Sequence, residues 1–168
     1  AGFDVEAVDL EPPASVWVRL GGSADRLAER LAGLERELGA SGRRLQGPDE
    51  AVHWERAREF AWAPDGSALA KVATLPDRIP AFDPVLAEFG AARRYSAAGH
   101  LCWLAWPRDA DPDRLDRTLR ELGLAGLWVT GRPRSALIGS VAGTEFGRRV
   151  RTALDPDGVF AESPGGAR

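Results

Sequence analysis

Alternation of hydrophobic and polar residues predicts a strand near the start of the chain, over residues 15–20, SVWVRL. Its aliphatic residues would share one face of a sheet, and Trp17 and Arg19 would lie on the other. A helical pattern follows, in which leucines recur every three or four residues (Leu27, Leu31, Leu34 and Leu38). Ser23 suits the N-cap of this helix and Gly39 its C-terminal stop. The first predicted elements are therefore a strand and an amphipathic helix.

The middle of the chain continues to alternate between helical and strand patterns. A second helix is expected from Asp49, as its cap, through Trp62, after which a Pro-Asp-Gly sequence stops it. Residues 68–75, ALAKVATL, are typical of a strand. A proline-bounded connection then leads to a short helix over residues 84–89.

A hairpin and two further helices are predicted after residue 90. Two strands, 92–97 and 100–106, are separated only by Ala98-Gly99 and are typical of a hairpin. A third long helix begins at Asp111-Pro112, because proline is favoured at the first helical position, and Gly123 ends it. The remaining pattern predicts one more strand and a last helix (127–129 and 144–154).

The last predicted helix is basic and amphipathic and ends abruptly at Asp155-Pro156-Asp157-Gly158. Pro156 disfavours helical geometry at the residue before it, and Gly158 accepts the positive φ that often closes such a turn. A short apolar strand is expected after the turn. A loose tail is expected over residues 161–168.

The order of these elements indicates the fold class. The chain reads as a βα(β)α region, then βαββαβ, then a helix. Strands that alternate with helices around a hairpin favour an α+β fold, a ferredoxin-like antiparallel sheet covered by helices, over a doubly wound parallel sheet. With 168 residues and 44% hydrophobic content, the chain is expected to build one domain, residues 1–168, around one core.

Charge and cysteine content indicate which partners and which cellular location to expect. A net charge of −3 lacks the clustered excess of Lys and Arg that phosphate binding needs, so nucleic acid is not an expected partner. Cys102 is the only cysteine and cannot form an internal disulfide, which fits a cytoplasmic location. No apolar run approaches the roughly 20 residues that cross a bilayer, so no membrane span is expected. The lack of methionine and the start at Ala1 lead us to expect a fragment of a longer polypeptide or a processed start.

Two groups of residues are candidates for binding an anionic substrate. Trp54 and Arg58 lie one helical turn apart, so the guanidinium could stack on the indole or form two hydrogen bonds with a carboxylate. In the hairpin, Arg94 would face away from Arg93 and Tyr95. An arginine against a core must meet an acid or a bound anion, so an internal acid and a substrate carboxylate both remain open as partners.

Other combinations of polar residues give weaker indications of a functional site. His100 and Cys102 lie two apart on a strand, but no orienting acid accompanies them and a buried structural cysteine is the commoner arrangement, so no catalytic residue is assigned. His53 and His100 have no clustered ligand partners, so no metal site is expected. Gly21-Gly22-Ser23 could present helix N–H groups to an anion, although an ordinary strand-to-helix turn also accounts for it.

Five segments together resemble a known family. They are VWVRLGG from Val16, WERARE from Trp54, TLP from Thr74, FGAARRY from Phe89 and DPDGVF from Asp155. In this order they resemble the C-terminal region of the FAD-binding subunit of bacterial glycolate oxidase, which belongs to the FAD-linked oxidases of the vanillyl-alcohol oxidase type. The resemblance implies a C-terminal cap domain that covers a flavin, with the FAD held mainly by a domain outside this chain.

The resemblance also implies an activity and its residues. Oxidation of a small 2-hydroxy acid would transfer a hydride to the flavin and would need cations that hold the carboxylate. The substrate contacts would come from Arg58, Arg94, Tyr95 and His100, and Phe160 in DPDGVF would contact the cofactor. The family usually continues from this phenylalanine as N-P-G-R, whereas this chain reads AESPG, so the tail contacts of the family are in doubt here.

By the same resemblance, the partners would be a sister flavoprotein subunit and an iron–sulfur subunit, in a cytoplasmic complex that could lie peripheral to the inner membrane. The chain alone would bind FAD poorly and catalyse nothing. A function of a different class is a free-standing ferredoxin-like module that binds a small ligand, or dimerises through its sheet, without redox chemistry.

Overall fold

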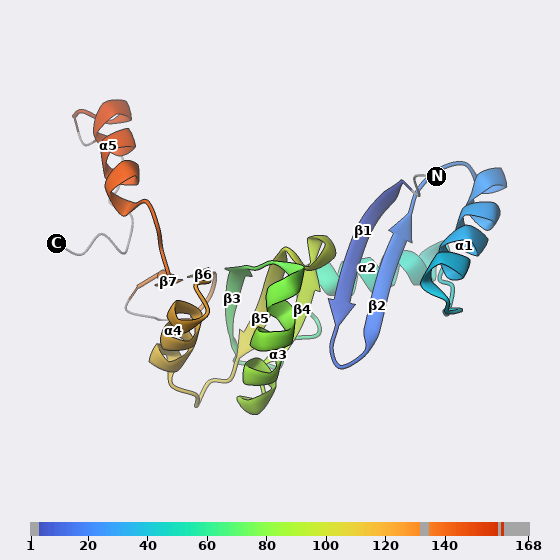
Figure 1. The fold of residues 1–168 in the computed structure, drawn as a ribbon, viewed down its shortest axis with the longest axis horizontal. Coiled ribbons are helices and arrows are strands. Elements are labelled where there is room, and N and C mark those ends of the chain that lie inside the picture. Colours follow the sequence, from blue (N-terminus) through green and yellow to red (C-terminus); the bar gives the residue numbers. More distant parts are fainter. Residues whose placement is uncertain (1–3, 132–134, 158, 160–168) are drawn as a thin grey trace.

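A computed structural model describes residues 4–131, 135–157 and 159 and shows an α+β fold (Figure 1). Its described part contains one seven-stranded antiparallel sheet and five α-helices, which confirms the predicted fold class. The strands are β1 (Val5–Glu11), β2 (Ser15–Leu20), β3 (Ala68–Ala73), β4 (Ala92–Ser96), β5 (Leu101–Trp106), β6 (Ala125–Trp128) and β7 (Leu137–Gly139). The helices are α1 (Ala24–Leu38), α2 (Pro48–Arg58), α3 (Ile79–Glu88), α4 (Pro112–Glu121) and α5 (Thr144–Leu154), with short 3-10 helices η1 (Pro76–Arg78) and η2 (Ala97–Gly99).

The sheet is built around the predicted βαββαβ unit. Its strands lie in the order β2-β1-β4-β5-β3-β6-β7, and every neighbouring pair is antiparallel. From β3 to β6 the chain runs βαββαβ, and the strand order β4-β5-β3-β6 is the ferredoxin-like arrangement. The β1–β2 hairpin extends this unit beside β4, where Leu10 is paired with Tyr95. β7 extends the opposite edge beside β6.

Local sequence signals fix several element ends as predicted. Gly39 stops α1 with a left-handed φ of 62°, a conformation that glycine adopts without the steric cost of a Cβ. Asp111 caps α4, because its side chain accepts a hydrogen bond from the backbone N–H of Asp113 at 3.0 Å. Ser23 occupies the N-cap position of α1, although its side chain makes no capping hydrogen bond.

Other element bounds differ from the prediction. The second helix ends at Arg58 rather than Trp62, because Phe60 has a φ of 55°, which an α-helix cannot include. Its N-cap is Gly47, and Asp49 lies in the first turn instead of capping it.

α3 begins earlier than predicted, at Ile79. Pro80 lies in its first turn, where the missing N–H costs no intrahelical hydrogen bond, and Pro84 lies inside the helix. β1 was not predicted, because each of its faces mixes hydrophobic and acidic residues in the sequence VEAVDLE.

The hydrophobic core lies between one face of the ferredoxin-like unit and helices α3 and α4. It takes alternate residues of the strands, such as Ala70 and Val72 of β3 and Cys102 of β5. All of its buried hydrophobic residues fall within residues 70–138. Among the described residues 4–69, Asp9 alone is buried. The N-terminal part therefore adds an ionic group, rather than apolar side chains, to the buried interior.

The remaining helices lie at the margins of the sheet. α2 passes behind β1 and β2, on the side opposite α3, and α5 extends away from the sheet altogether (Figure 1). α1 has half-buried leucines and ends on Leu38, which is exposed. Phe146 and Leu154 of α5 are 71% and 74% exposed. These helices leave apolar side chains in contact with solvent.

Candidate functional site

Strand β4 places successive side chains on opposite sides of the sheet, as its sequence predicts. Arg93 and Tyr95 face α3, where both contact Asp83. Arg94 faces the other way, toward β1 and α2. Both arginines meet an acid of this chain, which confirms that an arginine packed against this sheet requires a partner.

Among the residues that the structure describes, Arg94 is the one buried cation, with 5% of its surface exposed. Its Nε donates a hydrogen bond to Asp9 Oδ2 at 2.7 Å, and its Nη1 lies 3.7 Å from Glu11 Oε2. The guanidinium also lies 5.7 Å from the centroid of the Trp54 ring. Two carboxylates and an indole therefore already offset its charge within the chain.

His53 of α2 completes the surroundings of Arg94. Burial, and then the positive charge of Arg94, lower the pKa of His53, so the ring is neutral at neutral pH. In that state its Nε2 can accept a hydrogen bond from Nη2 of Arg94, 3.4 Å away. The ring stacks on Trp17 at a centroid distance of 3.9 Å, and Trp17 Nε1 donates to Glu11 at 3.0 Å. The cluster links β1, β2, β4 and α2.

On the other side of the sheet, Asp83 joins Arg93 to Tyr95. Arg93 forms a two-pronged pair with Asp83 through Nε and Nη2, both at 2.6 Å, and the Tyr95 hydroxyl donates to the same carboxylate at 2.9 Å. The hydrogen bond from Arg93 and then that from Tyr95 lower the pKa of Asp83 against the opposing effect of burial. Burial raises the pKa of Tyr95 and of Cys102, so both stay protonated and neither is an activated nucleophile or base.

The contribution of the Arg93–Asp83 pair to the free energy of unfolding should depend on pH, and replacing Asp83 tests this. Asp83→Asn is expected to lower the free energy of unfolding by about 1–2 kcal/mol at pH 7. In the folded protein the pKa of Asp83 lies below the ordinary 3.8, so the stabilisation is present above that pH and is lost as pH falls through the folded pKa. Urea unfolding of both proteins at pH 7 and near pH 3 should show the difference shrinking with pH. An equal difference at both pH values, or the same pattern in the exposed Asp65→Asn, would contradict this account.

The other predicted substrate residues lie apart from these clusters. Arg58 is exposed and donates from Nε to Glu59 at 3.0 Å. The cation over Trp54 is Arg94, so the expected stacking of Arg58 on this indole is wrong. His100 follows η2 and is exposed. Arg58 and His100 are thus exposed, whereas Arg94 and Tyr95 are buried on opposite sides of the sheet, so the structure does not gather the four residues into one site.

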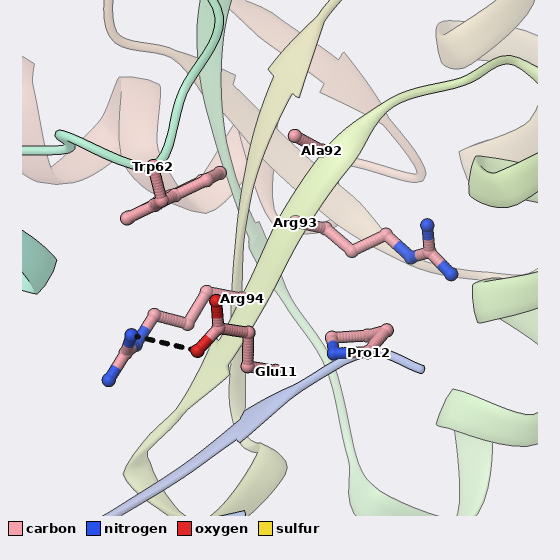
Figure 2. A pocket seen from close by; sticks show the side chains of 6 residues that line it. All are labelled: Glu11, Pro12, Trp62, Ala92, Arg93 and Arg94. Atoms are coloured by element: carbon pink, nitrogen blue, oxygen red, sulfur yellow. Dashed lines mark ion pairs between the residues drawn. The ribbon is translucent and has the colours of Figure 1, made fainter. Parts of the chain in front are cut away.

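A small cavity opens where β1 and β4 diverge beyond the paired Leu10 and Tyr95 (Figure 2). Its volume is about 150 Å³, and it is lined by Glu11, Pro12, Trp62, Ala92, Arg93 and Arg94. In Figure 2, Arg94 extends toward Glu11 while Arg93 points away to the other side of β4. Because Asp9 and Glu11 already match the charge of Arg94, a further anion would gain little here. The sequence analysis did not find this cavity, because it depends on the unpredicted β1.

A second feature, which we call the open face, is the side of β3, β5, β6 and β7 that faces away from the core. Strand alternation places Lys71 opposite to the buried Ala70 and Val72. Leu127 and Leu137 are 40% and 42% exposed, and Trp103 is half-buried and makes a T-shaped ring contact with Phe60, at a centroid distance of 5.0 Å. The open face comprises Leu69, Lys71, Trp103, Leu127, Val129 and Leu137. It is a largely apolar surface with one cation and no acid.

Within residues 4–131, 135–157 and 159, no group of three or more His, Cys, Asp or Glu side chains is placed to hold a metal ion. None of the helices in these ranges is both long and apolar enough to cross a membrane. The predicted cofactor contact Phe160, the short strand after Gly158 and the tail 161–168 lie outside the described residues. No family model, curated protein or solved structure compared with this chain matches it.

Proposed function

We propose that this chain is the cap domain of an FAD-linked oxidoreductase subunit that oxidises small 2-hydroxy acids. The observation that carries the proposal is the open face: the part of the sheet formed by β3, β5, β6 and β7 is packed with helices on one side and presents an apolar surface on the other. Such a surface can cover the reactive side of a flat ring and keep water from it. The family resemblance of the sequence supports the same reading.

The dimensions of the chain fit a lid better than a cofactor-binding domain. The cavity beside Arg94, of about 150 Å³, is below the roughly 300 Å³ of ordinary small-molecule pockets, and FAD is larger than the ligands that fill those. A second hollow, of about 410 Å³ beside the end of α1, is shallow and open to solvent, so it would not enclose FAD either. FAD bound in the complete protein would accept the hydride from the carbon that carries the substrate hydroxyl. Within this proposal, the chain itself supplies a wall that excludes water and orients the acid.

The incomplete burial of the outer helices supports a partner polypeptide. α1 and α5 expose leucine and phenylalanine side chains, and the described residues 4–69 contribute no buried apolar residue to the core. Exposed apolar patches of this kind mark contacts with other protein surfaces. A flavin-binding domain, a sister flavoprotein and an iron–sulfur subunit are the partners that the proposal assigns to these surfaces.

The test is the colour and the chemistry of the complete protein. The whole reading frame that contains this chain should be expressed together with its proposed partner subunits and purified. We expect visible flavin absorbance, which bleaches without oxygen on addition of glycolate, lactate or 2-hydroxybutyrate. Acetate and propionate, which lack the hydroxyl, serve as matched controls and should not bleach it. A colourless product would contradict the proposal and would favour the ligand-binding or dimerisation module instead.

A further inference from the structure

Lys71 is the only lysine among the 168 residues and lies in the middle of the open face. Strand register places it directly opposite Trp103 of β5 and Leu127 of β6. The same row continues to Leu137 on one side and to Arg94 on the other. Lys71 thus lies between apolar neighbours, Trp103 and Leu127, in a row that ends at the paired Arg94.

Lys71 has no carboxylate partner among the described residues, in contrast to both arginines of β4 and to Arg58. Arg93 is paired with Asp83, Arg94 with Asp9 and Arg58 with Glu59. Lys71 contacts only an aromatic ring: its Nζ lies 5.4 Å from the centroid of Trp103. An exposed cation–π contact is weak, so the ammonium is available for a stronger partner.

The surroundings of Lys71 favour an anion once the open face is covered. The face contributes no acid that could compete, and leucine and tryptophan side chains exclude water from the space beside the ammonium when a second surface lies against it. An ion pair is stronger in such a place than in bulk water. The flexible lysine stem lets a single point charge reach a small carboxylate.

We propose that Lys71 is the residue of this chain that binds the substrate carboxylate, with Trp103 as the adjacent wall of the substrate site. This inference rests on the proposed cap function and replaces Arg58 and Arg94 in that role. The ligand is a small acid held between the open face and the flavin. No covalent step is assigned to Lys71.

The test is steady-state kinetics of the purified flavin-containing complex with Lys71→Met. The methionine keeps the length of the aliphatic stem and removes the charge. We expect KM for glycolate or lactate to rise about 10- to 100-fold. The value of kcat should change little, because a contact made equally to substrate and transition state affects KM alone. Lys71→Arg should recover most of the affinity. Arg78→Gln, an exposed arginine of η1 outside the open face, should leave KM unchanged.

Three results would overturn the inference, each in a different way. An unchanged KM in a complex that keeps its flavin would remove Lys71 from the site while leaving the cap function standing. Loss of subunits or flavin from Lys71→Met, with a normal KM in what remains, would show that the anion is a carboxylate of a partner polypeptide. A colourless wild-type complex would remove both proposals together.

Chemical modification gives an independent readout. Because these 168 residues contain one lysine, amine-selective acetylation followed by peptide mass spectrometry identifies the Lys71 peptide unambiguously within them. Lactate should slow acetylation of the Lys71 peptide in the flavin-containing complex, and acetate should do so more weakly. Equal acetylation rates with and without these acids would contradict the proposal.

Discussion

Replacing Asp9 by asparagine is expected to destabilise the protein by about 3 kcal/mol, because it leaves the Arg94 charge buried without its nearest carboxylate. Removing one partner of a buried ion pair usually costs about 3–5 kcal/mol. The lower end is expected here, since Glu11 lies 3.7 Å from the same guanidinium and Trp54 faces it. Urea unfolding at pH 7, followed by tryptophan fluorescence, measures the difference.

An exposed ion pair provides the matched control for Asp9. Glu6 lies 3.4 Å from Arg19 in the same β1–β2 hairpin, and about half of its side chain is in solvent. Glu6→Gln should therefore change stability by less than about 0.5 kcal/mol. Replacing the whole buried pair, with Asp9→Leu and Arg94→Met, should be less harmful than Asp9→Asn alone. A loss below about 1 kcal/mol for Asp9→Asn would mean that Arg94 is already solvated or compensated in another way.

Gly139→Ala is expected to lower the free energy of unfolding by about 3–4 kcal/mol, as much as Asp9→Asn or more. Gly139 ends β7 with a φ of 80°, which an L-residue with a Cβ adopts at a cost of about 1–2 kcal/mol. A Cβ at this position would also lie 2.3 Å from the carbonyl oxygen of Leu124 and 2.7 Å from Cβ of Leu119. Neither atom belongs to the end of a flexible side chain, so the strand must shift and the core must open.

Gly123→Ala separates the cost of the positive φ from the cost of the steric contact of the added Cβ. Gly123 also has a positive φ, of 66°, but a Cβ there would meet nothing within 4 Å. It should therefore lose only about 1 kcal/mol. Thermal unfolding of both variants should show the larger fall in Tm for Gly139→Ala. Equal losses would mean that β7 adapts without strain and that packing against Leu124 has no part in the effect.

Local chemistry in the sequence determined most of the elements. Asp111-Pro112 starts α4 and Gly39 stops α1, because caps and glycine stops act through neighbouring backbone groups only. The alternation of hydrophobic residues in β2, β3 and β5 gave the strands, and their order with the helices gave the α+β fold class. The predicted end of the second helix was wrong because one backbone conformation decides it. Phe60 has a positive φ, which no pattern of hydrophobic and polar residues predicts.

The candidate site could be predicted only in part. At least one arginine of the hairpin was expected to meet an acid or a bound anion, since a buried charge without a partner is too costly, but the acids themselves were not identified. Asp9 is 85 residues away from Arg94 in sequence and lies on a strand whose mixed pattern concealed it. The grouping of Arg58, Arg94, Tyr95 and His100 depended on resemblance, and the structure places these residues apart, with Arg94 and Tyr95 buried on opposite sides of the sheet.

The sequence by itself determined the fold class, most element positions and the need to neutralise the hairpin arginines. The tertiary structure decided which charges are already satisfied and which remain available. Strand register carries Lys71 into a row with Trp103 and Leu127, while it brings Arg94 against Asp9. The physical reason is the sequence separation over which each interaction acts. Caps and periodicity depend on residues a few positions apart, whereas charge pairing and solvent exclusion depend on strands that become neighbours only when the sheet forms.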